Sequence, residues 1–377
     1  MSHPPHLAHG WNDAPMAPDW PPLRADEAAA VLARFPSLSP PLQLRWHSPR
    51  PFSAAARVAC AQGEVFLKRH HARVRNAAQL AEEHAFIAHL RAHGLPVPRV
   101  LVDAGGHSAI ALGEWTYEVH ALAEGLDLYR DAPSWTPPLS AAHARSAGRM
   151  LARLHLAARD FPARTRSTSL LVADADVLRA PDPLAAIAQA CTRRPGLAEA
   201  LATRDWVRAL APLLPALAAL QPRLAAQPPA WTHGDWHVSN LFWDGPGAQA
   251  EVAAILDFGL CAPTFALFDL ATAIERNAIA WLQPDPVTRA VFPEIACALL
   301  AGYAERLPLA REDIALVADL LPLVHLDFAL SELEYFHAVL RQPAMAAVAW
   351  EDFLLGHATW FAYPQAQALL QAIRGAE

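Results

Sequence analysis

A short polar segment, Trp231–Asn240, limits the possible folds of this chain more than any other stretch. It reads Trp-Thr-His-Gly-Asp-Trp-His-Val-Ser-Asn and interrupts a half of the chain that is rich in Ala and Leu at helical spacing. Two short apolar runs follow it and flank Gly245-Pro246-Gly247, which predicts a β-hairpin. The second run ends in Asp257-Phe258-Gly259. The fold must therefore place a polar loop and a small hairpin within a largely helical region.

Within this segment Asp235 and Asn240 are five residues apart, and Asp257 ends the hairpin that follows. Protein kinases have the same order and offset in their catalytic loop and metal-binding turn. Phosphoryl transfer requires a carboxylate that orients the attacking hydroxyl and accepts its proton, together with oxygen ligands for Mg²⁺. We therefore expect ATP and Mg²⁺ as cofactors, Asp235 as the catalytic base, and Asn240 and Asp257 as metal ligands.

The same segment also allows a metal-dependent hydrolase. His233 and His237 lie four residues apart and could bind zinc, with Asp235 between them. A polar loop that only caps the helical core is a third interpretation. The offset of Asn240 and the Asp-Phe-Gly on the next hairpin favour the kinase-like interpretation, because only a kinase needs Asn240.

The first half of the chain is mostly strand-forming, with one helix. Apolar residues on both sides of Gln62-Gly63 predict a hairpin whose second strand ends at Lys68. Residues 76–93 then show a helical pattern that stops at Gly94. A kinase needs a strand lysine for the α- and β-phosphates and a helix glutamate that orients this lysine. Lys68 and Glu83 meet this requirement, since Glu83 lies on the core-facing side of the predicted helix.

The expected fold class is therefore α+β and protein-kinase-like, with a small N-terminal sheet-plus-helix lobe and a larger, mostly helical C-terminal lobe. The expected divisions are a flexible Pro-rich tail at 1–22, a nucleotide-binding lobe at 23–122 and a catalytic and substrate lobe at 123–377. The tail is expected because the first 22 residues hold six prolines and three histidines without any period.

Composition excludes several classes of protein. Hydrophobic residues make up 54% and charged residues 18%, a balance typical of globular proteins. The net charge of −7 argues against nucleic acid as a partner. No uncharged apolar run reaches the roughly 18 residues that a membrane span requires. The four cysteines are scattered and the N-terminus lacks a signal-peptide pattern, so we expect a cytoplasmic protein with no nucleic acid or membrane partner.

Together these residues carry a resemblance to the aminoglycoside phosphotransferase superfamily, a protein-kinase-like group that includes choline, homoserine and bacterial stress-response kinases. The matching stretches are Lys68, Glu82–Ile87, Ala147–His155, His233–Asn240, Asp257–Gly259 and Phe268–Ala271. The resemblance implies that Lys68 contacts the ATP phosphates, that Glu83 pairs with Lys68, and that Asp269 anchors the catalytic loop. It also implies that backbone at the joint between the lobes contacts the adenine, at Val119, His120 and Ala121.

The loop expected to cover the nucleotide departs from the kinase pattern. Residues 48–57 contain no glycine, although the corresponding loop of protein kinases is glycine-rich. Members of the superfamily often use a serine-containing loop, so Ser53 is the expected phosphate contact. Lys68, Asp235 and Asp257 are all present, which argues against a pseudoenzyme that binds nucleotide without turnover.

The resemblance places the acceptor between the catalytic loop and the C-terminal helices. Asp327, Ser331 and Glu334 share one face of a predicted helix there, and Glu275-Arg276-Asn277 is a second candidate. A solvated polar stripe is the simpler interpretation of such a face. Trp281, Trp350 and Trp360 either line an apolar pocket or pack in the core. The expected partner is a small-molecule hydroxyl acceptor such as an amino alcohol, another metabolite or an aminoglycoside-like compound, with a protein Ser/Thr as the alternative.

Overall fold

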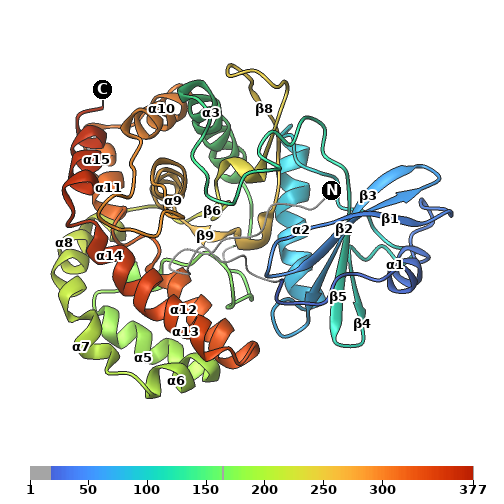
Figure 1. Ribbon diagram of the computed structural model, residues 1–377, viewed down its shortest axis with the longest axis horizontal. Helices are drawn as coiled ribbons and strands as arrows, with labels where there is room; N and C mark the ends of the chain where they lie inside the picture. Colours follow the sequence, from blue (N-terminus) through green and yellow to red (C-terminus); the bar gives the residue numbers. More distant parts are fainter. Residues whose placement is uncertain (1–17, 164, 377) are drawn as a thin grey trace.

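The computed structural model describes residues 18–163 and 165–376. Figure 1 shows a sheet-rich N-terminal lobe beside a larger lobe made mostly of helices, with α2 between them. The expected α+β fold class is confirmed. Residues 1–17 of the predicted tail lie outside the described residues. The described end of that tail is packed against both lobes, because the Asp19 N–H donates to the Pro51 carbonyl at 3.2 Å and Tyr335 Oη donates to the Asp19 carboxylate at 2.9 Å.

The N-terminal lobe is built on an antiparallel sheet with the strand order β1-β2-β3-β5-β4. Its strands are β1 Gln43–His47, β2 Ala54–Cys60, β3 Gly63–His71, β4 Ala109–Leu112 and β5 Trp115–Ala121. One face packs on α1 (Ala25–Leu32) through a separate apolar core that includes Leu67 and Val119. Because side chains alternate along a strand, the other face carries Lys68 on β3 and Glu118 on β5. These two residues are direct cross-strand neighbours.

The helix α2 (Ala77–Ala92) joins the two lobes. Asn76 caps its first turn by accepting a hydrogen bond from a backbone N–H at 3.0 Å, and Gly94 follows its end with φ of 77°. Phe86 and Leu90 are buried in the core of the helical lobe, not in the core of the sheet. His84 reaches the sheet from the same helix. The helix is therefore anchored to both lobes.

Residues 100–102 do not form a strand. Val100 makes an isolated bridge with His120, and the Leu101 N–H donates to the Val119 carbonyl at 2.8 Å. After β5, Leu126 exchanges two backbone hydrogen bonds with Trp243, at 2.7 and 3.0 Å. This bridge fixes the end of the linker to the predicted hairpin of the helical lobe.

The helical lobe contains that hairpin and a second pair of short strands. The strands are β6 Ala230–Thr232, β7 Leu241–Trp243, β8 Val252–Ile255 and β9 Ala262–Thr264, paired as β6 with β9 and β7 with β8. The helices before them are α3 Ala141–Ala158, α4 Asp176–Arg179, α5 Pro183–Arg193, α6 Pro195–Ala202, α7 Trp206–Leu210 and α8 Leu214–Ala225. The helices after them are α9 Ala266–Ala278, α10 Pro293–Ala304, α11 Arg311–Leu320, α12 Leu326–Glu334, α13 Pro343–Val348, α14 His357–Trp360 and α15 Pro364–Arg374. Two segments with π-helical bonding, Tyr335–Val339 and Ala349–Gly356, follow α12 and α13.

The region from α6 to α8 is divided by two local signals. Pro212 and Pro215 lie in first turns, where a missing N–H costs little. Between α6 and α7, the Asp205 side chain accepts the Arg208 N–H and so begins a new helix.

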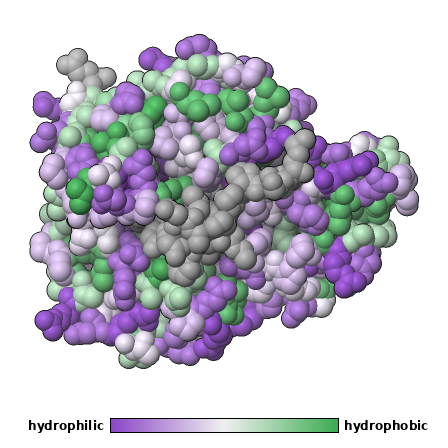
Figure 2. All heavy atoms as spheres, viewed as in Figure 1, coloured by the Kyte–Doolittle hydropathy of each residue, from purple (hydrophilic) through white to green (hydrophobic). Residues whose placement is uncertain are grey.

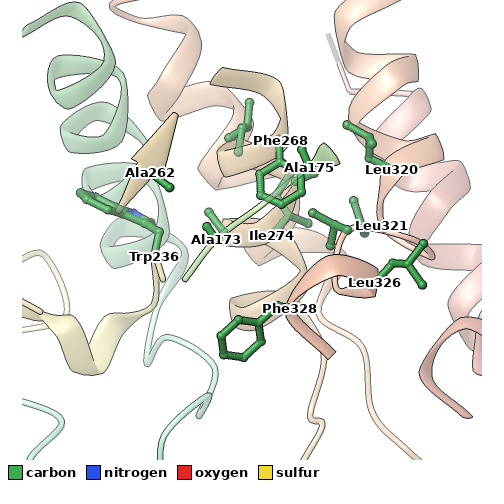
Figure 3. Close-up of a cluster of buried hydrophobic side chains, with 14 of the residues drawn as sticks. Ala173, Ala175, Trp236, Ala262, Phe268, Ile274, Leu320, Leu321, Leu326 and Phe328 are labelled. Atoms are coloured by element: carbon green, nitrogen blue, oxygen red, sulfur yellow. The ribbon is translucent and has the colours of Figure 1, made fainter. Parts of the chain in front are cut away.

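The polar segment packs against the apolar core of the helical lobe. In Figure 3, Ile274 of α9 lies at the centre of a group of buried apolar side chains with Phe268, Ala173 and Ala175 around it. Trp236, inside the polar segment itself, is fully buried near Ala262 of β9. The apolar residues on both sides of the polar groups therefore hold the segment against the lobe.

The surface gives no sign of a large apolar patch on the face drawn in Figure 2, where hydrophobic and hydrophilic residues are mixed over both lobes. The large hydrophobic side chains that are exposed are spread along the chain, at Val102, Leu112, Leu126, Leu139, Val207 and Val287. Among the described residues, no helix combines the length and the apolar character that crossing a bilayer requires.

Candidate active site

The side chain of Asp269 holds the polar segment Trp231–Asn240 in place. Asp269 accepts the backbone N–H groups of His233 and Gly234, both at 2.9 Å. His155 Nε2 lies 3.0 Å from the same carboxylate. Gly234 has φ of 76°, and a Cβ there would lie 2.6 Å from the Leu260 carbonyl oxygen, so only glycine fits. The prediction that Asp269 anchors this loop is confirmed.

Asp235 lines a cavity between the two lobes. Three side chains surround its carboxylate. The Asn240 amide donates to Asp235 Oδ2 at 3.0 Å and to its backbone carbonyl at 2.9 Å. Arg276 Nη1 donates to Oδ1, and His237 Nε2 lies 3.5 Å from the same oxygen. Burial lowers the pKa of His237 to about 3, so this imidazole is neutral. The Asn240 nitrogen is used on Asp235, which leaves the amide oxygen for another partner.

Asp257 follows β8 and meets Lys68 from the opposite lobe. Lys68 Nζ lies 3.0 Å from Asp257 Oδ1. Burial alone would raise the pKa of Asp257, but attraction to Lys68 outweighs burial and lowers the pKa well below its usual range. Burial alone would lower the pKa of Lys68, and attraction to Asp257 and Glu118 raises it instead. Both groups are therefore charged at neutral pH.

Glu83 is not paired with Lys68, and this prediction is wrong. Its carboxylate lies 2.8 Å from Arg166 Nη2, and both side chains are almost completely buried. Among the described residues, no ion pair within 4.0 Å joins Glu83 to Lys68. The reason is that the loop after α3 brings Arg166 to α2, while Asp257 takes the lysine. Glu83 still contributes to the raised pKa of Lys68 by long-range attraction.

Glu118, which the sequence analysis did not select, is the carboxylate across the strand from Lys68. It accepts hydrogen bonds from three imidazole nitrogens: His70 Nε2 at 2.8 Å, His84 Nε2 at 2.8 Å and His120 Nε2 at 2.7 Å. Burial alone would raise the pKa of Glu118, but these imidazoles lower it well below its usual range. The cluster fastens α2 to the sheet. Spacing alone could not indicate it, because its members come from three separate elements.

The backbone at Val119, His120 and Ala121 is largely engaged within the sheet. The Val119 carbonyl accepts the Leu101 N–H at 2.8 Å, and the Ala121 N–H donates to the Arg99 carbonyl at 2.9 Å. The His120 side chain is bound to Glu118. Of the backbone groups predicted to meet adenine, these two are therefore already hydrogen-bonded, and the unpaired linker begins only after Ala121.

The zinc hydrolase alternative is wrong. His233 Nε2 donates to the Leu256 carbonyl at 2.9 Å, and His233 Nδ1 accepts the Asp235 N–H at 3.2 Å. Both ring nitrogens of His233 thus already bond backbone groups, and neither is free to bind a metal. Within the described ranges, the one group of His, Cys, Asp and Glu side chains spaced closely enough to share an ion is His84, Glu118 and His120, in the other lobe.

The cavity has a volume of about 160 Å³ and lies between the lobes. Its lining residues include Arg50, Ser53, Lys68 and Asp257. Ser53 is thus where the sequence analysis expected it, in the loop that precedes β2. The loop also delivers Arg50, whose guanidinium donates to Ser134 Oγ and is attracted by Asp257. No spacing rule selects one arginine in a glycine-free loop, so Arg50 was not predicted.

The same cavity is also lined by Asp235, His237, Arg276 and Glu332. Its apolar wall is formed by Trp135, Phe328, Phe336, Met345, Val348, Ala349 and Phe353. Arg276 belongs to the second acceptor group predicted from the sequence. Glu332 lies on the predicted acceptor helix but not on the predicted face, so its position depends on how α12 packs.

The predicted face of α12 has a structural role instead. Asp327 accepts the Val177 N–H at 3.0 Å and so caps α4, and Ser331 Oγ accepts the Leu171 N–H at 2.6 Å. Glu334 pairs with Arg194 at 2.6 Å. Both interpretations of this face are therefore wrong: it is not a solvated stripe, because Asp327 and Ser331 are buried, and none of the three side chains lines the cavity. The predicted Trp281, Trp350 and Trp360 are buried and are not among the residues that line the cavity.

Comparison with known proteins identifies the family. The profile described as the phosphotransferase enzyme family matches residues 52–309. This chain belongs to the phosphotransferase enzyme family. Its curated relatives include a homoserine kinase of Methylobacterium radiotolerans, 31% identical over 60% of this chain and 60% of the relative, and one of Rhodopseudomonas palustris, 28% identical over 62% and 61%. The matched part thus spans about three-fifths of the length of these relatives.

Solved structures share the fold of this phosphotransferase family member. A microcompartment-associated aminopropanol kinase has a TM-score of 0.59 at 17% identity, and the match covers 94% of this chain and 99% of that one. An amicoumacin kinase in complex with AMP-PNP and Ca²⁺ has a TM-score of 0.56 at 14% identity, with 93% of each chain covered. At these identities the likeness establishes the fold, and the chemistry must be argued from this chain's own residues.

Proposed function

We propose that this phosphotransferase moves the γ-phosphoryl group of ATP to a hydroxyl group of a small molecule, with Mg²⁺ as cofactor and Asp235 as the catalytic base. One observation carries the proposal. Lys68, Asp257 and Asp235, the last of them held by Asn240, all line or face a single cavity. Phosphoryl transfer depends on positioning and charge stabilisation, and this arrangement supplies both.

The cationic side chains that line the cavity fit a nucleotide phosphate chain. Lys68 and Arg50 would neutralise phosphate oxygens, and the Ser53 hydroxyl would donate to one of them. In this loop the Arg50 side chain would bind the phosphates, a role that backbone N–H groups fill in a glycine-rich loop. Since two of the groups at 119–121 are already bonded to residues 99–101, we assign the adenine contacts to the backbone of residues 122–124.

The donor set of Asn240 and Asp257 fits Mg²⁺, which prefers carboxylate and carbonyl oxygens over nitrogen. The lowered pKa of Asp257 keeps its carboxylate ionised and able to bind a cation. When bound, Mg²⁺ would neutralise charge on the phosphates. The protein's own part is to fix both oxygen donors, Asn240 through Asp235 and Asp257 through Lys68.

Asp235 would accept a hydrogen bond from the acceptor hydroxyl and orient its oxygen toward the γ-phosphorus. In the transfer, a bond forms between the acceptor oxygen and the γ-phosphorus, and the bond from that phosphorus to the β,γ-bridging oxygen breaks. The hydroxyl proton goes to the Asp235 carboxylate, and ADP leaves with the electron pair. Arg276 and Asn240 hold the carboxylate in place, so no rotamer has to be selected during the reaction.

A small acceptor suits the cavity better than a protein chain. Its volume of about 160 Å³ is below the roughly 300–1,000 Å³ of typical ligand pockets. Phe52 of the nucleotide loop also packs on Tyr335 of the helical lobe, with ring centroids 5.5 Å apart, and so bridges one side of the cavity. The relatives named as homoserine kinases and the aminopropanol kinase of similar fold support an acceptor that is a small hydroxylated amine.

The test compares Asp235→Asn with Asp244→Asn, an exposed aspartate in the turn of the β7–β8 hairpin. With MgATP and a panel of small hydroxylated amines, Asp235→Asn should lower kcat by about 10²–10⁴-fold and leave MgATP binding close to that of the wild type. Asp244→Asn should change neither quantity. Full activity of Asp235→Asn would overturn the assignment of the base.

A further inference from the structure

Two imidazole nitrogens meet on one carboxylate oxygen in the N-terminal lobe. His84 Nε2 and His120 Nε2 lie 2.8 and 2.7 Å from the same atom, Glu118 Oε2. One ligand atom from each of these three side chains lies within 4.8 Å of the other two. His84 belongs to α2, whereas Glu118 and His120 are two residues apart on β5 and share a face of the sheet. A single ion placed between these atoms would therefore contact a helix and a strand at once.

The chemistry of these donors fits Zn²⁺ better than Mg²⁺. Imidazole nitrogen and carboxylate oxygen are ordinary zinc ligands, at about 2.0–2.2 Å, whereas Mg²⁺ prefers oxygen ligands. A zinc site with three protein ligands keeps its fourth position for water. The side chains of His84 and Glu118 are 4% and 1% exposed, and that of His120 is 15% exposed. The ion and its water would therefore enter from the side of His120.

Neighbouring groups hold the ligands in orientations that suit a metal. His84 Nδ1 lies 2.9 Å from Ser108 Oγ. When the proton is on Nδ1, the ring donates to this hydroxyl and presents the lone pair of Nε2, as a metal-binding histidine does. His70 Nε2 lies 2.8 Å from the other carboxylate oxygen, Glu118 Oε1. His70 thus fixes the carboxylate and leaves Oε2 to the other two rings.

The hydrogen bonds of this cluster differ from those that argue against zinc at His233. The Nε2 atoms of His84 and His120 bond to Glu118, which is itself a proposed ligand. An ion that replaces these bonds keeps all three groups coordinated. At His233 the partners are a backbone carbonyl and a backbone N–H, and a metal would leave both of them unpaired.

We infer that His84, Glu118 and His120 form a Zn²⁺ site, with His70 and Ser108 as positioning residues. The ion would join α2 to β5, and the free energy of its binding would add to the stability of the folded protein. The inference goes beyond the proposed phosphotransfer and does not rest on it, because the proposed Mg²⁺ ligands belong to the helical lobe.

Titration of the untagged, metal-free protein with ZnCl₂ tests the inference. In every protein compared, His3, His6 and His9 are replaced by alanine, because these residues could bind Zn²⁺ on their own. No nucleotide is added. Calorimetric titration of this parent protein should give one Zn²⁺ per chain. Its Tm should rise by about 5 °C at a Zn²⁺ concentration about a hundred times Kd.

Further substitutions in this parent assign the contacts. His120→Gln changes the most exposed ligand, so the fold should be kept, which its unfolding transition without ZnCl₂ checks. It should lose both the stoichiometric binding and the rise in Tm. His70→Gln and Ser108→Ala should each weaken Zn²⁺ binding by about 10–100-fold, the loss typical of a residue that orients a metal ligand. His93→Gln is the matched control. It changes a histidine at the end of the same helix, whose ring lies 4.2 Å from that of His89, and it should leave the affinity unchanged.

Either of two results would overturn the inference. The first is a parent protein that takes up no stoichiometric Zn²⁺, and the second is a His120→Gln protein that binds Zn²⁺ with the affinity of the parent. Binding that is kept in His120→Gln but lost in Asp257→Asn would place the ion in the phosphotransfer site instead. Failure of the proposed function looks different, since it appears as absent MgATP binding or turnover and leaves the result of the zinc titration unaffected.

Discussion

The position of Asp235 in the cavity, where Asn240, Arg276 and His237 surround its carboxylate, follows from local spacing in the sequence, whereas the positions of some other cavity residues do not. Asp235, Asn240 and Asp257 lie within 23 residues of one another, and their spacing reflects one loop and one hairpin. Arg50 and Glu332 reach the same cavity from distant parts of the chain. Their orientation depends on how two lobes pack, and the sequence around each of them carries no sign of that packing.

Glu275, next to Arg276 on α9, allows a prediction about pH. Its carboxylate is buried with His357 Nε2 at 2.9 Å, and burial raises the pKa of Glu275 to about 8 from 4.5. A raised pKa means that the folded state binds a proton more tightly than the unfolded state. The contribution of Glu275 to the free energy of unfolding is therefore largest below pH about 4.5, and it decreases as the pH rises to about 8.

Glu275→Gln should remove this dependence. The variant and the wild type should have similar free energies of unfolding near pH 5, and the variant should be more stable near pH 8 by a difference on the order of a few kcal/mol. Urea denaturation at several pH values measures this difference. The exposed Glu294→Gln is the control, with no pH-dependent gain. A difference that shrinks between pH 5 and pH 8 would contradict the account.

At the scale of elements, α2 shows where prediction succeeds and where it stops. Its bounds follow from local signals, Asn76 at the start and Gly94 at the end, so the sequence predicted them to within a residue or two. The partner of Glu83 is not a local property. It is Arg166, brought in by a loop 83 residues further along the chain, and the expected pair with Lys68 is absent for this reason.

The Glu83–Arg166 pair can be tested by a double-mutant cycle. Glu83→Met or Arg166→Met alone should lower the free energy of unfolding by about 3–5 kcal/mol, because each leaves an unpaired buried charge. The double variant should recover most of this loss, since two apolar side chains then pack together. Urea denaturation of the four proteins gives the coupling energy. Additive losses in the double variant would show that the two charges do not compensate each other.

At the scale of the whole molecule, the two-lobed architecture was predictable because strand-forming and helix-forming patterns are separated along the chain. The contacts that join the lobes were not. Phe86 of α2 packs on Trp231 and Phe161 of the helical lobe, with ring centroids 5.0 and 5.1 Å apart. Lys68 and Asp257 make a second connection. Through α2 the core of the helical lobe therefore reaches the N-terminal lobe, whose sheet also has a separate apolar core against α1.

Because α2 contacts both lobes, we expect the lobes to unfold together. Phe86→Ala should lower the free energy of unfolding by about 3–5 kcal/mol and should reduce hydrogen-exchange protection in both β3 and α9. Phe66→Ala, on the half-buried side of β3, is the comparison and should have a smaller effect. Loss of protection confined to one lobe in the Phe86→Ala protein would show that the lobes are independent folding units.

The central claim is that Lys68, Asp257 and Asn240 form a site for a nucleotide with Mg²⁺ next to Asp235. Thermal unfolding with ATP, in the presence and absence of Mg²⁺, tests it most directly. We predict a rise in Tm with ATP that is larger with Mg²⁺, is retained in Asp235→Asn, loses its Mg²⁺ dependence in Asp257→Asn and is strongly reduced in Lys68→Ala. A wild-type Tm that does not respond to ATP with or without Mg²⁺ would contradict the account.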